Sequence, residues 1–185
     1  GSGALQQTNG YENVAVGSRA LQQTNTGYEN VGIGNNALSQ NNNGYQNVGI
    51  GNGSLSQNTN GYENIALGNS SLGGNNNGFE NIAIGYSAGL SLRDANNNTI
   101  IGNNAVSGGS NQNSNKHSVL GASTNVAQNT DGSVVLGYGA ESTASNQFVV
   151  GSTTESAGAV ATAATAQTKV WNVVINGIAQ QILLA

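Results

Sequence analysis

Apolar triplets recur along the chain at a fixed interval. Each triplet places a large aliphatic residue on either side of a small one, as in residues 14–16 (Val-Ala-Val) and 82–84 (Ile-Ala-Ile). A Gly follows each triplet, and from Gly17 to Gly102 these glycines lie 17 residues apart. Alternation with a period of two predicts a strand, and self-similarity at this interval predicts a solenoid in which each repeat forms one coil.

The triplets and the residues after them suggest how a coil is built. We expect the two large side chains to face the interior and the small middle residue to face outward, where its size would let another backbone approach. An Ala-Leu or Ser-Leu pair, such as Ala37-Leu38, follows each of the first four triplets and predicts a second strand whose Leu fills the core. Burying about three large side chains gives ~5–8 kcal/mol per coil. Ordering a coil costs more than this, so we expect chains to associate.

The composition is that of a repeat protein. The chain has 28 Gly, no Pro, Cys or Met, and only 6% charged residues, while its 36% hydrophobic content is too regularly placed for a disordered chain. A net charge of −4 with four Lys and Arg argues against nucleic-acid partners and anionic membranes. No apolar run is long enough to span a membrane as a helix, and no secretion signal opens the chain. Because it begins within a repeat, we expect a piece of a longer protein.

The sequence divides into three parts. Residues 1–151 form about nine coils, the last with intervals of 19, 16 and 14 residues, which predicts an all-β, repetitive parallel β-roll or β-solenoid. Residues 152–168 form a connector rich in Ser, Thr and Ala. Residues 169–185 contain two apolar runs around Asn176-Gly177, a strong β-hairpin signal. We expect this C-terminal hairpin to cap the open end of the roll.

The repeat resembles a known family. Residues 81–88 (Asn-Ile-Ala-Ile-Gly-Tyr-Ser-Ala) closely resemble the head repeat of trimeric autotransporter adhesins, and the match covers roughly residues 3–155. The resemblance implies a left-handed parallel β-roll that associates as a homotrimer. This chain differs by three extra polar residues in most coils, all placed in one turn.

The C-terminal arrangement is similar to the distal part of bacteriophage tail fibres and of related contractile injection systems. That resemblance implies a trimeric structural segment, located in a virion tail fibre or another extracellular assembly, that attaches to a host-surface glycan or protein. The alternative is the head domain of a bacterial trimeric surface adhesin. An ice-binding solenoid is a third possibility, but Thr24, Thr26 and Thr59 are too sporadic to form regular rows.

The polar turns are the first candidate binding surface. They fall at the same place in each unit, so they should line one face, and insertions on one face of an array often bind partners. Uncharged amides and hydroxyls suit hydroxyl-rich ligands. Together with Trp171 of the hairpin, the receptor-binding candidates are Asn41, Asn42, Asn43, Asn58, Asn60, Asn75, Asn76, Asn77, Asn111, Asn113 and Asn115.

Two further rows repeat along the chain. An aromatic edge row should stack at ~4.8 Å per coil. Its rings could dock sugar rings, but we expect them to pack against a neighbouring turn or chain. The row consists of Tyr11, Tyr28, Tyr45, Tyr62 and Phe79. The Glu residues that follow, at positions 12, 29, 63 and 80, should form a solvated edge. An Asn precedes each early strand, and we expect these residues to form an internal amide ladder.

Candidate chemistry is sparse. His117 is the only His; three copies on a trimer axis could bind a metal, but no second His or carboxylate lies near it in sequence, so we expect no metal site. No paired acids or Ser/His/Asp order indicate a catalytic site, and the Gly-rich segments do not precede helices as phosphate loops do. We therefore predict no catalytic residues, no enzyme activity and no cofactor.

Overall fold

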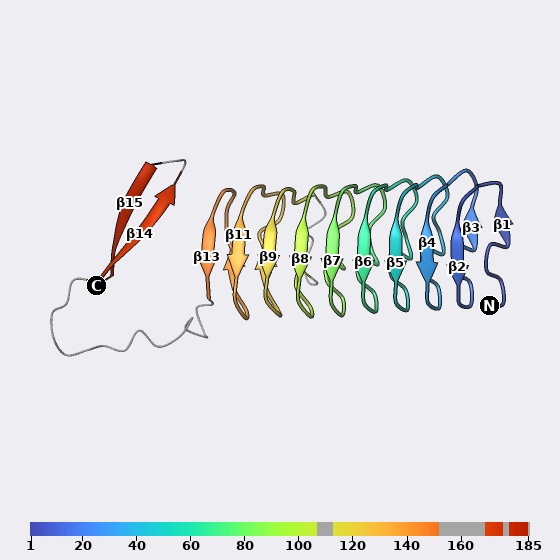
Figure 1. The fold of residues 1–185 in the computed structure, drawn as a ribbon, viewed down its shortest axis with the longest axis horizontal. Helices are drawn as coiled ribbons and strands as arrows, with labels where there is room; N and C mark the ends of the chain where they lie inside the picture. The colour runs from blue at the N-terminus through green and yellow to red at the C-terminus, as the bar shows by residue number, and fades with distance from the viewer. Residues whose placement is uncertain (107–112, 152–168, 176–177, 185) are drawn as a thin grey trace.

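The computed structural model describes residues 1–106, 113–151, 169–175 and 178–184. Its main feature is a parallel sheet of nine three-residue strands, stacked in chain order as successive coils (Figure 1). The strands are β2 (Val14–Val16), β4 (Val31–Ile33), β5 (Val48–Ile50), β6 (Ile65–Leu67), β7 (Ile82–Ile84), β8 (Thr99–Ile101), β9 (Ser118–Leu120), β11 (Val134–Leu136) and β13 (Phe148–Val150). The described ranges contain no helix, and the predicted all-β parallel solenoid is confirmed.

The predicted second strand is wrong for most coils. Among the described residues, two short parallel pairs lie outside the main sheet: β1 (Gln7–Thr8) with β3 (Gln23–Thr24), and β10 (Asn125–Val126) with β12 (Glu141–Ser142). The Ala-Leu pairs lie in turns, where Leu38 has a φ of 52°. A left-handed backbone cannot continue a strand, so the coil bends at the residue that fills its core.

The predicted orientation of the triplets is also wrong. The middle residues face the interior, as with Ala66 and Ala83, both fully buried, whereas Ile82 and Ile84 on either side of Ala83 are exposed. The interior is narrow because a Leu from the opposite turn already occupies it. A Cβ added at Gly32 would lie 3.2 Å from Leu21 Cγ. The middle residue is therefore small because of a Leu of its own chain, and not because another chain approaches.

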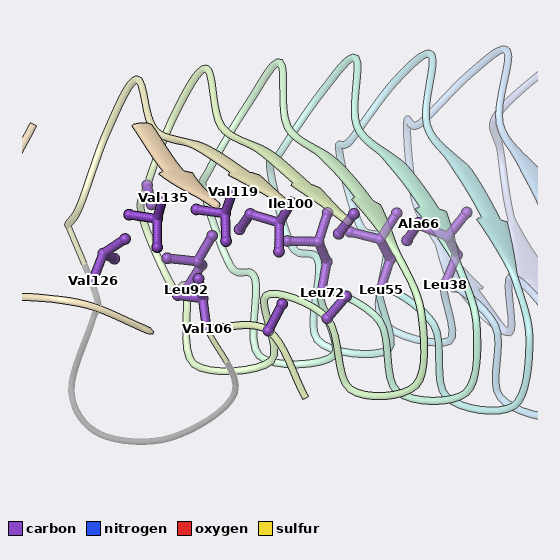
Figure 2. Packing of buried hydrophobic residues seen from close by; sticks show 14 of the residues in the cluster. Leu38, Leu55, Ala66, Leu72, Leu92, Ile100, Val106, Val119, Val126 and Val135 are labelled. Carbon is purple, nitrogen blue, oxygen red and sulfur yellow. The ribbon is translucent and has the colours of Figure 1, made fainter. Parts of the chain in front are cut away.

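The core is a single line of side chains along the stack. Figure 2 shows Leu38, Leu55 and Leu72 pointing from the turns toward the strands, with Ile100, Val119 and Val135 continuing the line from the sheet. All six are buried, so the prediction that the repeated Leu fills the core is confirmed.

One coil replaces the standard core by a different set of residues. Gly89 stands where the preceding coil has Leu72, and the space is taken by Ile100 and Leu92. A Cβ at Gly89 would lie 3.5 Å from Cδ1 of each and 2.9 Å from Leu72 Cδ2. Apolar volume is thus conserved although its source along the chain changes.

Left-handed residues shape each turn. In one coil Glu63, Ser70 and Leu72 have φ values of 54°, 56° and 47°, and equivalent positions repeat this along the roll. The corner after each strand accepts only Gly. At Gly34, with φ 136°, a Cβ would lie 2.4 Å from the Gly51 carbonyl oxygen of the next coil.

The C-terminal region contains an antiparallel pair, β14 (Lys169–Ile175) and β15 (Ile178–Leu184), in which Trp171 is opposite Ile182. The predicted turn at 176–177 and the connector at 152–168 lie outside the described residues, so the cap remains a prediction. No helix in the described ranges is long and apolar enough to cross a membrane.

Candidate functional site

The outer face of the nine-stranded sheet carries two columns of large side chains, which we call the apolar face. The strand-start column consists of Val14, Val31, Val48, Ile65, Ile82, Thr99, Ser118, Val134 and Phe148. The strand-end column consists of Val16, Ile33, Ile50, Leu67, Ile84, Ile101, Leu120, Leu136 and Val150. Eleven of the apolar members are exposed, from 36% at Ile33 to 68% at Phe148, and five are half-buried: Val31, Val48, Leu67, Val134 and Leu136. A continuous exposed apolar surface of this kind marks an interaction site.

Thr99 and Ser118 are the two polar residues of the apolar face. They are paired neighbours on β8 and β9, and both are exposed. Neither hydroxyl forms a hydrogen bond within the part of the chain that the structure describes. Sequence reasoning missed the whole face because it placed the large side chains inside the coil.

A buried ladder of amides joins the coils at the start of each strand, and we call it the Asn13 ladder. Asn30 donates from its backbone N and its Nδ2 to Asn13 Oδ1, at 3.0 Å in both cases, and Nδ2 also donates to the Gly44 carbonyl at 2.9 Å. The same contacts to the preceding Asn recur at Asn47, Asn64, Asn81 and Asn98. The predicted internal amide ladder is confirmed.

His117 takes the place of Asn in this ladder. Its backbone N donates to Asn98 Oδ1 at 3.0 Å, and its ring is 2% exposed. The Ser133 backbone N donates to its Nδ1 at 3.1 Å, which leaves Nε2 to donate to the Thr130 carbonyl at 2.8 Å. This pattern requires the neutral ring, and burial lowers the pKa of His117 although two backbone hydrogen bonds and Asp131 oppose the shift.

A second buried ladder, the Asn41 ladder, contains three of the predicted receptor-binding residues. Asn58 donates to Asn41 Oδ1 and Asn75 donates to Asn58 Oδ1, both at 2.6 Å. All three are fully buried, so they support the coil and offer no surface to a receptor. The ladder ends at Leu92, which stands at the next equivalent position and cannot donate. Asn75 Oδ1 is accordingly buried without a hydrogen-bond partner.

A third ladder lies on the surface, and we call it the Thr26 ladder. Thr26 donates to Asn43, Asn43 to Asn60, Asn60 to Asn77, and Asn77 to Asp94, at 2.7–2.9 Å. The predicted binding residues Asn43, Asn60 and Asn77 are exposed here. Each amide uses one N–H and one acceptor site within the ladder, so a further N–H and lone pair face solvent.

The remaining candidates lie beside this ladder or outside the described atoms. Asn42 and Asn76 are half-buried and accept backbone hydrogen bonds from neighbouring coils. Asn113 is exposed, and Asn115 is half-buried with its Nδ2 3.0 Å from Asp131 Oδ1. Asn111 and the side chain of Trp171 lie outside the described atoms.

The aromatic row forms a continuous stack. Centroids of successive rings from Tyr11 to Phe79 are 4.7–5.1 Å apart, with interplanar angles of 2–5°. The predicted spacing is confirmed, and the ring faces within the row are occupied by each other rather than open to sugars. Partial desolvation, with nearby phenols and glutamates, raises the pKa of Tyr11 and Tyr45. After Phe79 the row continues in Asn96, whose Oδ1 accepts from the Phe79 backbone N.

The predicted solvated Glu edge is present. Glu12, Glu29, Glu63 and Glu80 are all exposed. Gln46, which interrupts the row, donates to Glu29 Oε2 at 2.7 Å, and this relieves repulsion between like charges. Within the described residues no three His, Asp or Glu side chains come together as a metal site.

Comparison with known proteins gives no identification: no family model, no curated protein and no solved structure matches this chain.

Proposed function

We propose that the chain is a structural and receptor-binding distal segment of a homotrimeric fibre, belonging to a viral tail or an injection system. Three copies associate through the apolar face, and the polar turns attach to a host-surface glycan or protein. The apolar face is the observation that carries the proposal, because eleven of its large side chains are exposed in the described chain.

The energetics favour association. Eleven side chains of the apolar face are at least 36% exposed. Fully burying such a side chain contributes about 1.5–3 kcal/mol, so covering the exposed part contributes roughly 0.6–1.2 kcal/mol each and about 7–13 kcal/mol per chain. Each association costs about 4–15 kcal/mol. A trimer covers three faces, about 21–39 kcal/mol, for two associations that cost about 8–30 kcal/mol, so the middle of the range of gains exceeds the middle of the range of costs.

The polar turns supply the receptor-binding part of the proposal. The Thr26 ladder is exposed and presents free amide donors and acceptors in three successive coils, at Asn43, Asn60 and Asn77. Regularly spaced amides recognise hydroxyl-rich or peptide ligands by hydrogen bonding, without the need for charge.

Light scattering on the purified chain tests the association. We expect a mass of three times 18.5 kDa. Replacing Ile33 and Ile50 by Lys should give monomers, because two charges per chain would be buried in the interface. The matched control replaces Gln40 and Gln57, exposed in the adjoining turns, by Lys and should remain trimeric. A monomeric parent chain, or equal behaviour of the two variants, would contradict the proposal.

Receptor binding is tested separately on the trimer. A glycan array with the parent chain and with an Asn43→Leu, Asn60→Leu variant should show binding that the variant loses. Absence of binding to glycans and to host-cell surfaces would leave only the structural role. Neighbouring genes would separate a tail fibre from the alternative, the head of a bacterial surface adhesin.

A further inference from the structure

We propose that Thr99 and Ser118 set the register in which the chains associate, by meeting their own copies on the fibre axis. The inference rests on the proposed association through the apolar face. The two hydroxyls make an otherwise apolar surface specific for one alignment of the chains.

A repetitive apolar face does not define its own register. Val and Ile recur at the same two positions in strand after strand, so a copy shifted by one coil meets nearly the same side chains. Contacts of this kind contribute stability without distinguishing a shifted or reversed arrangement from the aligned one. A shift by one coil leaves only one strand in nine without a counterpart, so the aliphatic residues by themselves select the alignment weakly.

The two hydroxyl residues break this uniformity at one level only. Thr99 and Ser118 lie in the sixth and seventh strands of the nine, next to each other in the strand-start column. Ile82 precedes them and Val134 follows them in that column. The strand-end column is apolar at the same level, with Ile101 and Leu120. Hydroxyls thus form a single polar island on the apolar face.

Covering the face removes these hydroxyls from water, so each needs a new partner. A hydroxyl has one donor and two lone pairs, and neither hydroxyl has a partner within the described chain. In a parallel, aligned trimer with the strand-start column at the axis, three Thr99 and three Ser118 hydroxyls share one short section of the axis. Cyclic symmetry places the three copies of each residue at one level around the axis, where they can hydrogen-bond to one another in a closed ring.

Other arrangements leave hydroxyls against aliphatic side chains. A shift by one coil pairs Thr99 with Ser118 but leaves two hydroxyls per interface without a partner, because they then face Ile82 and Val134. Full antiparallel overlap pairs the sixth and seventh strands with the fourth and third, so both residues face Ile65 and Val48. Each hydroxyl buried without a partner lowers the association constant roughly tenfold. A one-coil shift is therefore disfavoured by about a hundredfold per interface. A single polar residue sets register in coiled coils in the same way.

Distances between spin labels test the register. The chain has no Cys, so Gln40→Cys and, separately, Gln128→Cys each give one nitroxide per chain at exposed positions in distant coils. In the parent trimer both sites should give one narrow distance, because equivalent residues lie at one level. The test variant is Thr99→Val with Ser118→Val, which makes the strand-start column fully aliphatic. The matched control, Thr99→Ser with Ser118→Thr, keeps both hydroxyls.

The outcomes separate the inference from the proposed function. We expect the Val variant to remain associated by light scattering but to show several distances, since each coil of displacement adds ~4.8 Å along the axis. The control should keep the narrow distributions. If the Val variant keeps one narrow distance at both sites, the hydroxyls do not set the register, although the association stands. A monomeric parent chain would overturn both.

Discussion

The coil that contains Gly89 gives the sharpest test of how the core is built. In the other early coils a Leu from the turn packs against a small residue of the next strand, as Leu72 does with Ala83. Here the arrangement is reversed: Gly89 takes the Leu position and Ile100 the small one, while Leu92 replaces the amide of the Asn41 ladder. Three substitutions, Gly89→Leu, Leu92→Asn and Ile100→Ala, would return this coil to the standard pattern.

The three substitutions divide into two halves, Gly89→Leu on the one hand and Leu92→Asn with Ile100→Ala on the other. Either half alone should strongly destabilise the fold. Gly89→Leu alone would overfill the core, because its Cβ already lies 2.9 Å from Leu72 Cδ2, and we expect a cost of about 1–3 kcal/mol. Leu92→Asn with Ile100→Ala would leave a cavity beside Gly89. Since each loss of a large buried side chain costs about 2–5 kcal/mol, this half should cost at least about 4 kcal/mol.

The triple variant should return to within about 1.5 kcal/mol of the parent chain, because volume is again conserved and only the left-handed backbone at position 89, with φ of 64°, keeps a cost of about 1 kcal/mol. The amide at position 92 would supply the donor that Asn75 Oδ1 lacks. Urea unfolding followed by circular dichroism, with all variants in the same oligomeric state, gives the three free energies of unfolding. The coupling between the halves should be at least about 3 kcal/mol.

Additivity would refute this reasoning. If the triple variant is destabilised by the sum of its two halves, Gly89 does not exchange volume with Leu92 and Ile100. Leu92→Ala serves as a control, because it removes apolar volume without restoring an amide. Its cost should be that of the lost volume alone.

Three further changes test other features of the roll. Gly53→Ala should lower the free energy of unfolding by about 1 kcal/mol, measured with urea, because φ at this position is 64°. The nearest atom to a new Cβ, Ser70 Oγ, is 3.7 Å away, so the cost comes from backbone strain alone. A gain in stability would contradict this strain. The pKa of His117 is lowered in the folded chain, so stability should be complete above pH 6.5 and fall below it, by at most about 1.4 kcal/mol per pH unit. His117→Asn should remove that dependence between pH 7.5 and 5.5, and an unchanged slope would exclude the ring as its source. Tyr45→Ala interrupts two stacked contacts and should cost about 1–3 kcal/mol, whereas Tyr45→Phe should cost less than 0.5 kcal/mol; equal costs would argue against stacking.

Much of the coil could be predicted from the sequence because its repeats are regular. The 17-residue interval predicted the parallel stack, the recurring Tyr predicted the ring spacing, and the recurring Asn predicted the buried ladder. Strict repetition at one position means that identical residues lie above one another, so each row follows directly from the interval.

The orientation of the strands could not be predicted from alternation alone. A period of two separates two faces but does not say which one is inside, and the general preference for buried aliphatic residues favoured the wrong face. One signal in the sequence does identify it. The middle residue is small where a Leu lies 11 positions earlier, as with Leu21 and Gly32, and becomes Ile100 where that position is Gly89. This exchange of size requires the middle residue to face the core.

The receptor-binding candidates were only partly separable by sequence. Asn41 and Asn43 are two residues apart in the same polar turn, yet one is fully buried and the other exposed. Composition gives both the same hydrogen-bonding capacity, and only the path of the turn decides which amide points inward.

The direction of the Asn13 ladder has a consequence for biosynthesis. In the contacts between successive Asn residues the donors belong to the later coil and the acceptor oxygen to the earlier one, as with Asn47 donating to Asn30, and only the second Nδ2 hydrogen donates forward, as from Asn30 to Gly44. A ribosome delivers about 5–20 residues per second, so one coil emerges in roughly one to three seconds, far longer than the ~10–100 ns needed to close a short loop. Each newly synthesised coil therefore meets a completed row of acceptors on the coil before it. The roll can be assembled from its amino terminus, one turn at a time, while the rest of the chain is still being translated.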